Sequence, residues 1–438
     1  MQKRRLYVLC GCVVCAVVLT SCSGQKDLPS GKRIAVLDVG QTIKRDVAKT
    51  AHQIRVPAEV SNNEWLQSDI NVAHTAVNLK AGTAFQKQWS APFGRGSSKR
   101  EFLISKPLVK KGVVYTLDAD GVLNAFQLKD GEKIWTLELE SSNHRVSATS
   151  LKGSGIAISG DRIYVSTGFG VVAAVDLNKQ TKVWEKNLYA PLRIAPVVAN
   201  GMLYAQSVDN KFFALDIKDG NILWQHDIAL ESTTLIGGSQ AAYDKVSDMV
   251  VTGFSNGEIQ SFNATLGLPL WSDILVANRR AYSSTFLHTV KAAPVIENGI
   301  VYALGNADIL VAVDLRTGER IWEKEIGGTE TPLLVADTLY VVTGDKQLAA
   351  FDKENGNVLW VVKVRADKAD EKARIYAPVM MNGHLIVTMS DGHVLSYDPR
   401  SGTLEKTVDL DEDLNSAPIV ADEYILFTTM NAKLLAFK

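Results

Sequence analysis

The sequence predicts an all-β protein, an eight-bladed β-propeller of four-stranded blades. Three observations predict it: a strand-rich unit ending in tryptophan recurs along the chain, its last copy stops before the tryptophan, and a lone strand ending in tryptophan precedes the first copy. The 438 residues are 46% hydrophobic and 22% charged, as in ordinary globular proteins. A repeat of this kind favours one ring-shaped domain over the two or three domains that the length alone suggests.

The repeated unit alternates strands and tight turns. In the first copy Val114-Tyr115 is followed by Asp120-Gly121, the strand 123–126, Asp130-Gly131 and Ile134-Trp135. Side chains that alternate with period two indicate strands, and Asp-Gly or Asn-Gly pairs supply the positive φ of tight hairpins. Six copies close on a tryptophan, a seventh has lysine at this position, and an eighth stops at the last residue: Trp135, Trp184, Trp224, Trp271, Trp322, Trp360, Lys406 and Lys438.

The strand missing from the eighth copy lies at the other end of the repeat region. Residues 85–89 form an outer strand that ends in Trp89 and has no partner strand before it. Residues 85–438 then hold eight units of about 44 residues, the length of a four-stranded blade. We expect this N-terminal strand to complete the C-terminal blade, which closes the ring. We expect the tryptophans to pack between blades rather than to form a ligand-stacking cage.

The N-terminus resembles the signal of a bacterial lipoprotein. Lys3, Arg4 and Arg5 precede the apolar run 6–19, which is too short for a comfortable membrane span, and the run leads into Leu19-Thr20-Ser21-Cys22. We predict a signal peptide over residues 1–21 and lipidation of Cys22; the alternative is an ordinary signal peptide that contains cysteine. Ser23 favours sorting to the outer membrane. The predicted location is the periplasmic face of that membrane, through a lipid anchor.

Between the signal and the repeats, residues 22–84 lack the repeated unit. We predict a lipidated tether that packs partly on the propeller. Cys22 would be the only cysteine of the mature chain, because the other three precede it, so we predict no disulfide.

The sequence offers no catalytic, metal or cofactor site. Lys and Arg total 47 against 48 Asp and Glu, so no net positive field attracts nucleic acid. Residues 118–121 (Asp-Ala-Asp-Gly) look like the start of a calcium loop, but Lys129 stands where that loop needs glutamate. The histidines show no metal-binding spacing, and no nucleophile or phosphate-loop motif occurs. We therefore predict a protein that is not an enzyme and that has no cofactor.

Two families share features with this chain. The unit Ala-x-Asp-x-x-(Thr/Asp/Asn)-Gly-x-x-(Leu/Ile)-Trp resembles the repeat of quinoprotein dehydrogenases, which implies a calcium site and a catalytic aspartate. The adjacent cysteine pair of many such enzymes is absent. The lipoprotein signal, the tether and eight blades without cofactor apparatus together resemble the BamB family of lipoproteins. That resemblance implies a scaffold of the machinery that assembles outer-membrane β-barrels.

By the BamB resemblance, the partners are the periplasmic domains of BamA, the other subunits of that complex and unfolded outer-membrane proteins. The chain would be monomeric within the hetero-complex, held at the outer membrane by its lipid and without a nucleic-acid partner. Two alternatives stay open, a quinoprotein-type dehydrogenase and an envelope lipoprotein propeller with a different partner, such as peptidoglycan, since propeller folds do not determine function.

Propeller geometry predicts where a partner binds. Loops that lead from one blade to the next share a face with the loops between the two middle strands of each blade. The first kind varies most here, over residues 140–154, 187–194, 227–239, 273–292 and 365–376. Several of these loops carry cations, which favours a partner with acidic patches: Arg193, Arg279, Arg280, Lys291 and Arg374.

The BamB family binds its partner through a Leu-x-Leu-Arg stretch and an Asp-x-Asp pair two blades further on. Leu192 and Arg193 match the end of the first motif, and we predict them as a hydrophobic anchor and a charged donor. Thr289 and Lys291 stand where the acids are expected, so no role passes to them, and Lys291 would need an acidic partner.

Overall fold

The computed structural model describes residues 43–46, 53–97, 103, 105–139, 155–192, 194–229, 235, 237–276, 287–307 and 309–438. The chain divides into two units, Met1–Thr42 and Ile43–Lys438, and all described residues belong to the second. The predicted signal peptide and Cys22 lie outside the described residues. Within the described ranges no helix has the length and apolar character to span a membrane.

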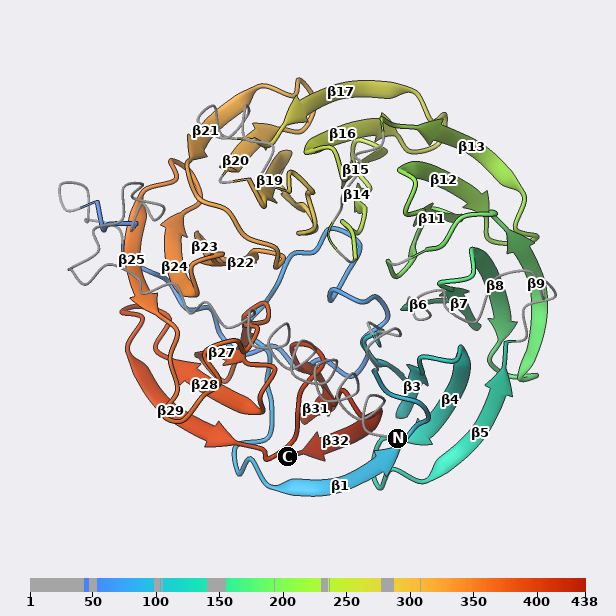
Figure 1. Cartoon of the computed structure of the whole chain (residues 1–438), viewed down its shortest axis with the longest axis horizontal. Helices are drawn as coiled ribbons and strands as arrows, with labels where there is room; N and C mark the ends of the chain where they lie inside the picture. Colours follow the sequence, from blue (N-terminus) through green and yellow to red (C-terminus); the bar gives the residue numbers. More distant parts are fainter. Residues whose placement is uncertain are drawn as a thin grey trace, which may run out of the picture. The chain divides into compact units, whose positions relative to one another are not determined.

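The second unit is a ring of eight antiparallel sheets, each of four strands, which confirms the predicted fold class (Figure 1). Blades 1 to 7 follow one another along the chain, and in each the strands run in sequence order from the central channel to the rim.

The first four blades are blade 1 with β2 (Leu108–Lys110), β3 (Val113–Leu117), β4 (Val122–Gln127) and β5 (Lys133–Glu138); blade 2 with β6 (Gly155–Ser159), β7 (Arg162–Ser166), β8 (Val171–Asp176) and β9 (Thr181–Asn187); blade 3 with β10 (Val197–Ala199), β11 (Met202–Gln206), β12 (Lys211–Asp216) and β13 (Ile222–Asp227); and blade 4 with β14 (Ala242–Asp244), β15 (Met249–Gly253), β16 (Glu258–Asn263) and β17 (Pro269–Ile274).

The remaining blades are blade 5 with β18 (Val295–Glu297), β19 (Ile300–Gly305), β20 (Ile309–Asp314) and β21 (Arg320–Lys324); blade 6 with β22 (Leu333–Val335), β23 (Thr338–Val342), β24 (Gln347–Asp352) and β25 (Val358–Lys363); blade 7 with β26 (Val379–Met381), β27 (His384–Thr388), β28 (His393–Tyr397) and β29 (Leu404–Asp409); and blade 8 with β30 (Ile419–Ala421), β31 (Tyr424–Thr428), β32 (Lys433–Phe437) and, from the other end of the chain, β1 (Lys87–Pro92).

The seam of the ring lies in blade 8, as predicted. Strand β1 pairs antiparallel with β32, with Trp89 opposite Ala436; the blue and red ends of the chain lie side by side there in Figure 1. Phe85 stacks on Phe437, with ring centroids 4.9 Å apart. The last residues of the chain are therefore held by an early strand, which leaves no free edge at the seam.

Tryptophans of the repeat pack on a glycine in a turn of the following blade. This contact confirms the prediction that the tryptophans pack between blades. Trp360 in β25 donates its indole N–H to the Pro399 carbonyl at 3.0 Å. A Cβ on Gly402 would lie 2.6 Å from Cε3 of that ring, and φ of Gly402 is +70°. Only glycine meets both demands. The same pairing joins Trp89 to Gly131, Trp184 to Gly220, Trp224 to Gly267, Trp271 to Gly318 and Trp322 to Gly356.

The lysine that replaces the seventh tryptophan has a structural reason. Lys406 lies in β29 opposite Ser396, the position that Trp360 occupies opposite Ala350 one blade earlier. A tryptophan here would face the turn between the third and fourth strands of blade 8. Blade 8 has no such turn, because its third strand, β32, and its fourth strand, β1, are not consecutive in the chain.

Residues 60–82 lie inside the ring, where the blue trace of Figure 1 passes round the inner ends of the blades. We call this stretch the channel segment. It contacts the innermost strands through backbone hydrogen bonds, for example between Trp65 and Val109 and between Leu79 and Met380. Trp65 is 3% exposed and belongs to the main hydrophobic cluster, so this part of the predicted tether is integral to the core.

Candidate functional site

The two faces of the ring differ in the connections they carry. The hairpin face holds the tight turns between strands 1 and 2 and between strands 3 and 4 of each blade. The loop face holds the turns between strands 2 and 3 and the connections from one blade to the next, because alternate strand ends of an antiparallel sheet meet at opposite edges. The described strands that flank the loops singled out by sequence end at this loop face.

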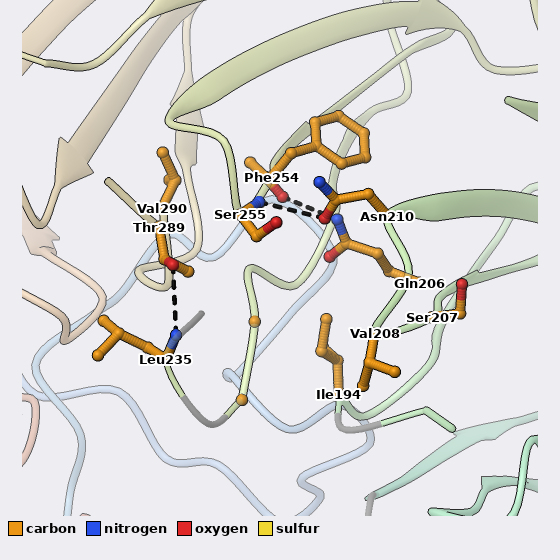
Figure 2. A pocket seen from close by; sticks show the side chains of 13 residues that line it. Ile194, Gln206, Ser207, Val208, Asn210, Leu235, Phe254, Ser255, Thr289 and Val290 are labelled. Carbon is orange, nitrogen blue, oxygen red and sulfur yellow. Dashed lines mark hydrogen bonds between the residues drawn. The ribbon is translucent and has the colours of Figure 1, made fainter. Parts of the chain in front are cut away.

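A small pocket opens on the loop face between blades 3 and 4, with a volume of about 30 Å³ (Figure 2). Its walls come from three connections between blades and from the middle turns of blades 3 and 4. They include Ile194, Gln206, Asn210, Leu235, Ser255 and Thr289. The pocket therefore lies among the loops 187–194, 227–239 and 273–292, where the sequence analysis expected a partner to bind.

Close backbone approach and side-chain hydrogen bonds build this pocket. A Cβ on Gly253 would lie 2.3 Å from Cγ1 of Val290, so glycine lets these two walls meet. Gln206 donates from Nε2 to the Gly253 carbonyl at 3.0 Å, which joins blade 3 to blade 4. The Ser255 backbone N–H donates to Oδ1 of Asn210 at 3.2 Å. These bonds cross between blades, so the pocket walls are held by the ring itself.

Two polar atoms of the pocket lining have no hydrogen-bond partner among the described residues: Oε1 of Gln206 and Oγ of Ser255, which are both buried. Because Nε2 of Gln206 donates to Gly253, its Oε1 requires a donor. Oγ of Ser255 can donate or accept. The volume of about 30 Å³ matches one water molecule, which could donate a hydrogen bond to either atom.

The structure corrects the predicted role of Leu192. This side chain is 0% exposed and packs in a cluster with Leu188 and Phe213. Its backbone N–H donates to the Thr167 carbonyl at 3.2 Å, and it forms an antiparallel bridge with Ser207. Leu192 therefore anchors the loop 187–194 to the ring and presents no apolar surface to a partner.

Arg193 lies outside the described residues. Of its described neighbours, Ile194 lines the pocket and Leu192 bridges to Ser207. Arg279 and Arg280 also lie outside the described residues. Arg374 donates its backbone N–H to Oγ of Ser390 at 2.9 Å, and this residue is exposed.

Sequence reasoning missed Tyr189, which is the exposed aromatic residue of the same loop. Its side chain is 87% exposed, and its φ is +62°. The backbone N–H of Tyr189 donates to Oδ1 of Asn187 at 2.7 Å, which holds this left-handed conformation. Tyrosine is enriched at interface hot spots, because it buries a large area at a low entropic cost. An aromatic residue between Asn187 and Pro191 was the available signal.

Thr289 and Lys291 are engaged within the chain. Oγ1 of Thr289 accepts a hydrogen bond from the Leu235 N–H at 3.3 Å, and the residue is buried. Nζ of Lys291 lies 3.5 Å from Oε1 of Glu330, so the acidic partner that Lys291 requires is intramolecular. Neither residue offers the acidic contact of the family motif.

No group of three or more His, Cys, Asp or Glu side chains in the described ranges is arranged to hold a metal ion. The pocket lining contains no carboxylate, histidine or lysine that could serve Ser255 as a base.

Comparison with known proteins places this chain among assembly factors of the outer membrane. The family model described as "Outer membrane protein assembly factor BamB" matches residues 141–362 and 349–438. The protein of that name from Yersinia pestis is 26% identical over 356 residues, which cover 80% of this chain and 88% of the relative.

Two of the solved structures that resemble this chain come from different kinds of protein. The crystal structure of BamB from Moraxella catarrhalis superposes with a TM-score of 0.69 at 16% identity, covering 81% of this chain and 99% of that one. A quinohemoprotein alcohol dehydrogenase from Pseudomonas putida HK5 gives 0.67 at 14% identity, covering 88% and 83%. At these identities the structures show a shared propeller fold.

Proposed function

This chain belongs to the family of the outer membrane protein assembly factor BamB, and we propose that it acts in the assembly of outer-membrane proteins as a scaffold without catalytic activity. The family match carries this proposal. The exposed Tyr189 of the loop face supports it, because tyrosine is enriched at interface hot spots.

The proposed location is the periplasmic face of the outer membrane. The relatives are named outer membrane protein assembly factors, which supports the outer membrane as the location. We also propose that residues 1–21 are removed and that Cys22 carries the lipid. The tether from Cys22 would then reach the propeller at residue 53 or earlier, without crossing the membrane.

The proposed partners are the periplasmic domains of BamA and the other subunits of that complex, with unfolded outer-membrane proteins as substrates. The docking site is the loop 187–194, where Tyr189 supplies the exposed aromatic contact and Arg193 a charged donor. The buried side chain of Leu192 anchors this loop to the ring.

A quinoprotein-type dehydrogenase is the second candidate, and the observation that favours it is fold similarity at 14% identity. An envelope propeller with another client is the third. Copurification separates these candidates, because only the proposed function requires capture of BamA domains.

The test is capture of purified BamA periplasmic domains by the immobilised full-length protein. Tyr189→Ala and Arg193→Glu should each raise the dissociation constant roughly tenfold, the effect of losing an interface hot spot. Val246→Ala is the matched control, since Val246 is 96% exposed but lies in the β14–β15 turn on the hairpin face. Unchanged capture by both loop variants would remove this loop from the proposed interface.

A further inference from the structure

Every blade has one strand edge that faces the channel. The innermost strand of each blade pairs only with the second strand of the same blade. Its other edge presents backbone N–H and C=O groups that need partners, because unpaired backbone groups are costly when water is excluded. Such an edge is the kind of surface that binds an extended peptide by strand addition.

The channel segment meets all eight of these edges in ring order. It starts at blade 8, passes blades 1 to 7 and returns to blade 8. The hydrogen bonds are Asp422 N–H to Asn62 O at 2.7 Å, Trp65 N–H to Val109 O at 2.7 Å, Ile158 N–H to Leu66 O at 2.8 Å, Gln67 Nε2 to Val198 O at 3.4 Å, Tyr243 N–H to Val72 O at 2.7 Å, Ile296 N–H to Ala73 O at 2.9 Å, Ala76 N–H to Leu334 O at 3.2 Å, Leu79 N–H to Met380 O at 3.0 Å and Gly82 N–H to Glu423 O at 2.8 Å.

The contacts fall at equivalent positions of the blades. In blades 1, 3, 4, 5, 6 and 7 the partner is the middle residue of a three-residue innermost strand, such as Val109, Leu334 or Met380. In blade 8 the side chain of Asn62 donates to Val420, again the middle residue of its strand. The segment therefore contacts a backbone position that recurs from blade to blade. Because backbone groups make these contacts, the sequence of the segment itself does not have to repeat.

Buried side chains hold the segment at intervals. Trp65 and Leu79 are almost fully buried, as is Asn78, whose Oδ1 accepts the Gly383 N–H at 2.9 Å. His74 is also buried and bonds through Nδ1 to the Pro294 carbonyl at 2.8 Å. Asp69 forms an ion pair with Lys106, and its Oδ2 accepts from Oγ1 of Thr331 at 3.2 Å.

The segment enters and leaves through the hairpin face. Just before it, Arg55 lies 3.5 Å from Asp337 in the β22–β23 turn. At its end, Gly82 bonds to Glu423 in the β30–β31 turn. The loop face, with Tyr189 and the pocket, is therefore on the other side of the ring from Arg55 and Gly82.

We propose that the channel wall of this propeller is a binding surface for an extended polypeptide, and that residues 60–82 of the chain are its resident, covalently attached ligand. While the segment is bound, its backbone uses the edges that an external strand would need.

The test uses the full chain with a protease recognition sequence inserted between Thr83 and Ala84, which are both exposed. After cleavage, the fragment that ends at residue 83 should stay with the ring through gel filtration. Trp65→Ala and Leu79→Ala should each speed its release roughly tenfold or more, because each removes a buried anchor. Val77→Ala is the matched control: Val77 lies in the segment but is 39% exposed.

Hydrogen exchange of the uncut, unmodified chain gives an independent measurement. Amides of residues 65, 76, 79 and 82 donate to the channel wall, so they should exchange as slowly as the innermost strands. The proposal is overturned if the fragment leaves a folded ring on the first column, or if these amides exchange at the rate of an unstructured peptide.

Discussion

Two regions without the blade repeat, the loop 187–194 and the channel segment, use their residues in opposite ways. The loop buries Leu192 and exposes Tyr189, so one side chain holds it and another is available to a partner. The channel segment buries Trp65, His74 and Leu79, and its backbone forms hydrogen bonds with the innermost strands. Departure from the repeat therefore occurs both in an exposed loop, where we propose that a partner binds, and in a segment packed into the core, and burial distinguishes the two.

The largest expected effect comes from Trp65→Ala in the channel segment. Truncating a buried tryptophan typically costs about 3–5 kcal/mol of unfolding free energy. Urea denaturation followed by tryptophan fluorescence and circular dichroism measures it. Val77→Ala should change stability by less than about 0.5 kcal/mol. Equal effects of the two variants would mean that the segment does not belong to the core.

The next effect separates the two roles within the loop. Leu192→Ala should lower the unfolding free energy by about 2–4 kcal/mol, because it leaves a cavity in a fully buried site. Tyr189→Ala should leave stability within about 0.5 kcal/mol, because its side chain is 87% exposed. Thermal melts of both variants beside the capture assay show whether stability and binding are carried by different residues. Loss of stability in Tyr189→Ala would contradict the division.

A smaller effect is the pH dependence of the channel segment. Burial lowers the pKa of His74, with Asp69 acting against this shift. Burial raises the pKa of Asp69, but the charges of Lys106 and His74 outweigh it, and the pKa is lowered overall. Below about pH 6.5 the unfolded chain binds a proton at His74 that the folded chain resists. Stability should therefore fall on acidification, by up to about 1.4 kcal/mol per pH unit for one proton. Asp69 adds to this loss only below its ordinary pKa of 3.8.

His74→Asn isolates this contribution. Asparagine tolerates the φ of +60° at this position, and its amide can donate to the Pro294 carbonyl as Nδ1 of histidine does. The variant should lose part of the difference in melting temperature between pH 7.5 and pH 5.5. An unchanged difference would assign the pH dependence to other groups.

The smallest expected effect is that of Lys406→Trp. In other blades the tryptophan packs on a glycine turn, but blade 8 has no such turn for residue 406 to meet. Restoring the repeat should therefore change stability by less than about 0.5 kcal/mol. Trp360→Ala is the reference, with an expected loss of about 3–5 kcal/mol. A clear gain in stability from Lys406→Trp would show that the seam offers a packing site for the indole ring.

Most of the ring could be predicted from the chain, and most of the site could not. The repeat placed the strands, the turns and the strand that ends in Trp89, because each feature depends on local periodicity or turn chemistry. We predicted that Leu192 contacts a partner, but its side chain is buried in the ring. An apolar residue beside Pro191 can point either to the core or to solvent, and the sequence does not decide between the two. Tyr189 was overlooked because its exposure depends on how Asn187 and Leu192 hold the loop.

The sequence by itself determined the number of blades, the closure of the ring through Trp89 and the positions of the inter-blade tryptophans. These features repeat, and a repeat can be counted without knowing any long-range contact. Only the tertiary structure decided that residues 60–82 line the channel and that Leu192 faces the core. The physical reason is that the channel segment is recognised by backbone groups of eight separate blades, and a backbone hydrogen bond leaves no signature in the residues that make it.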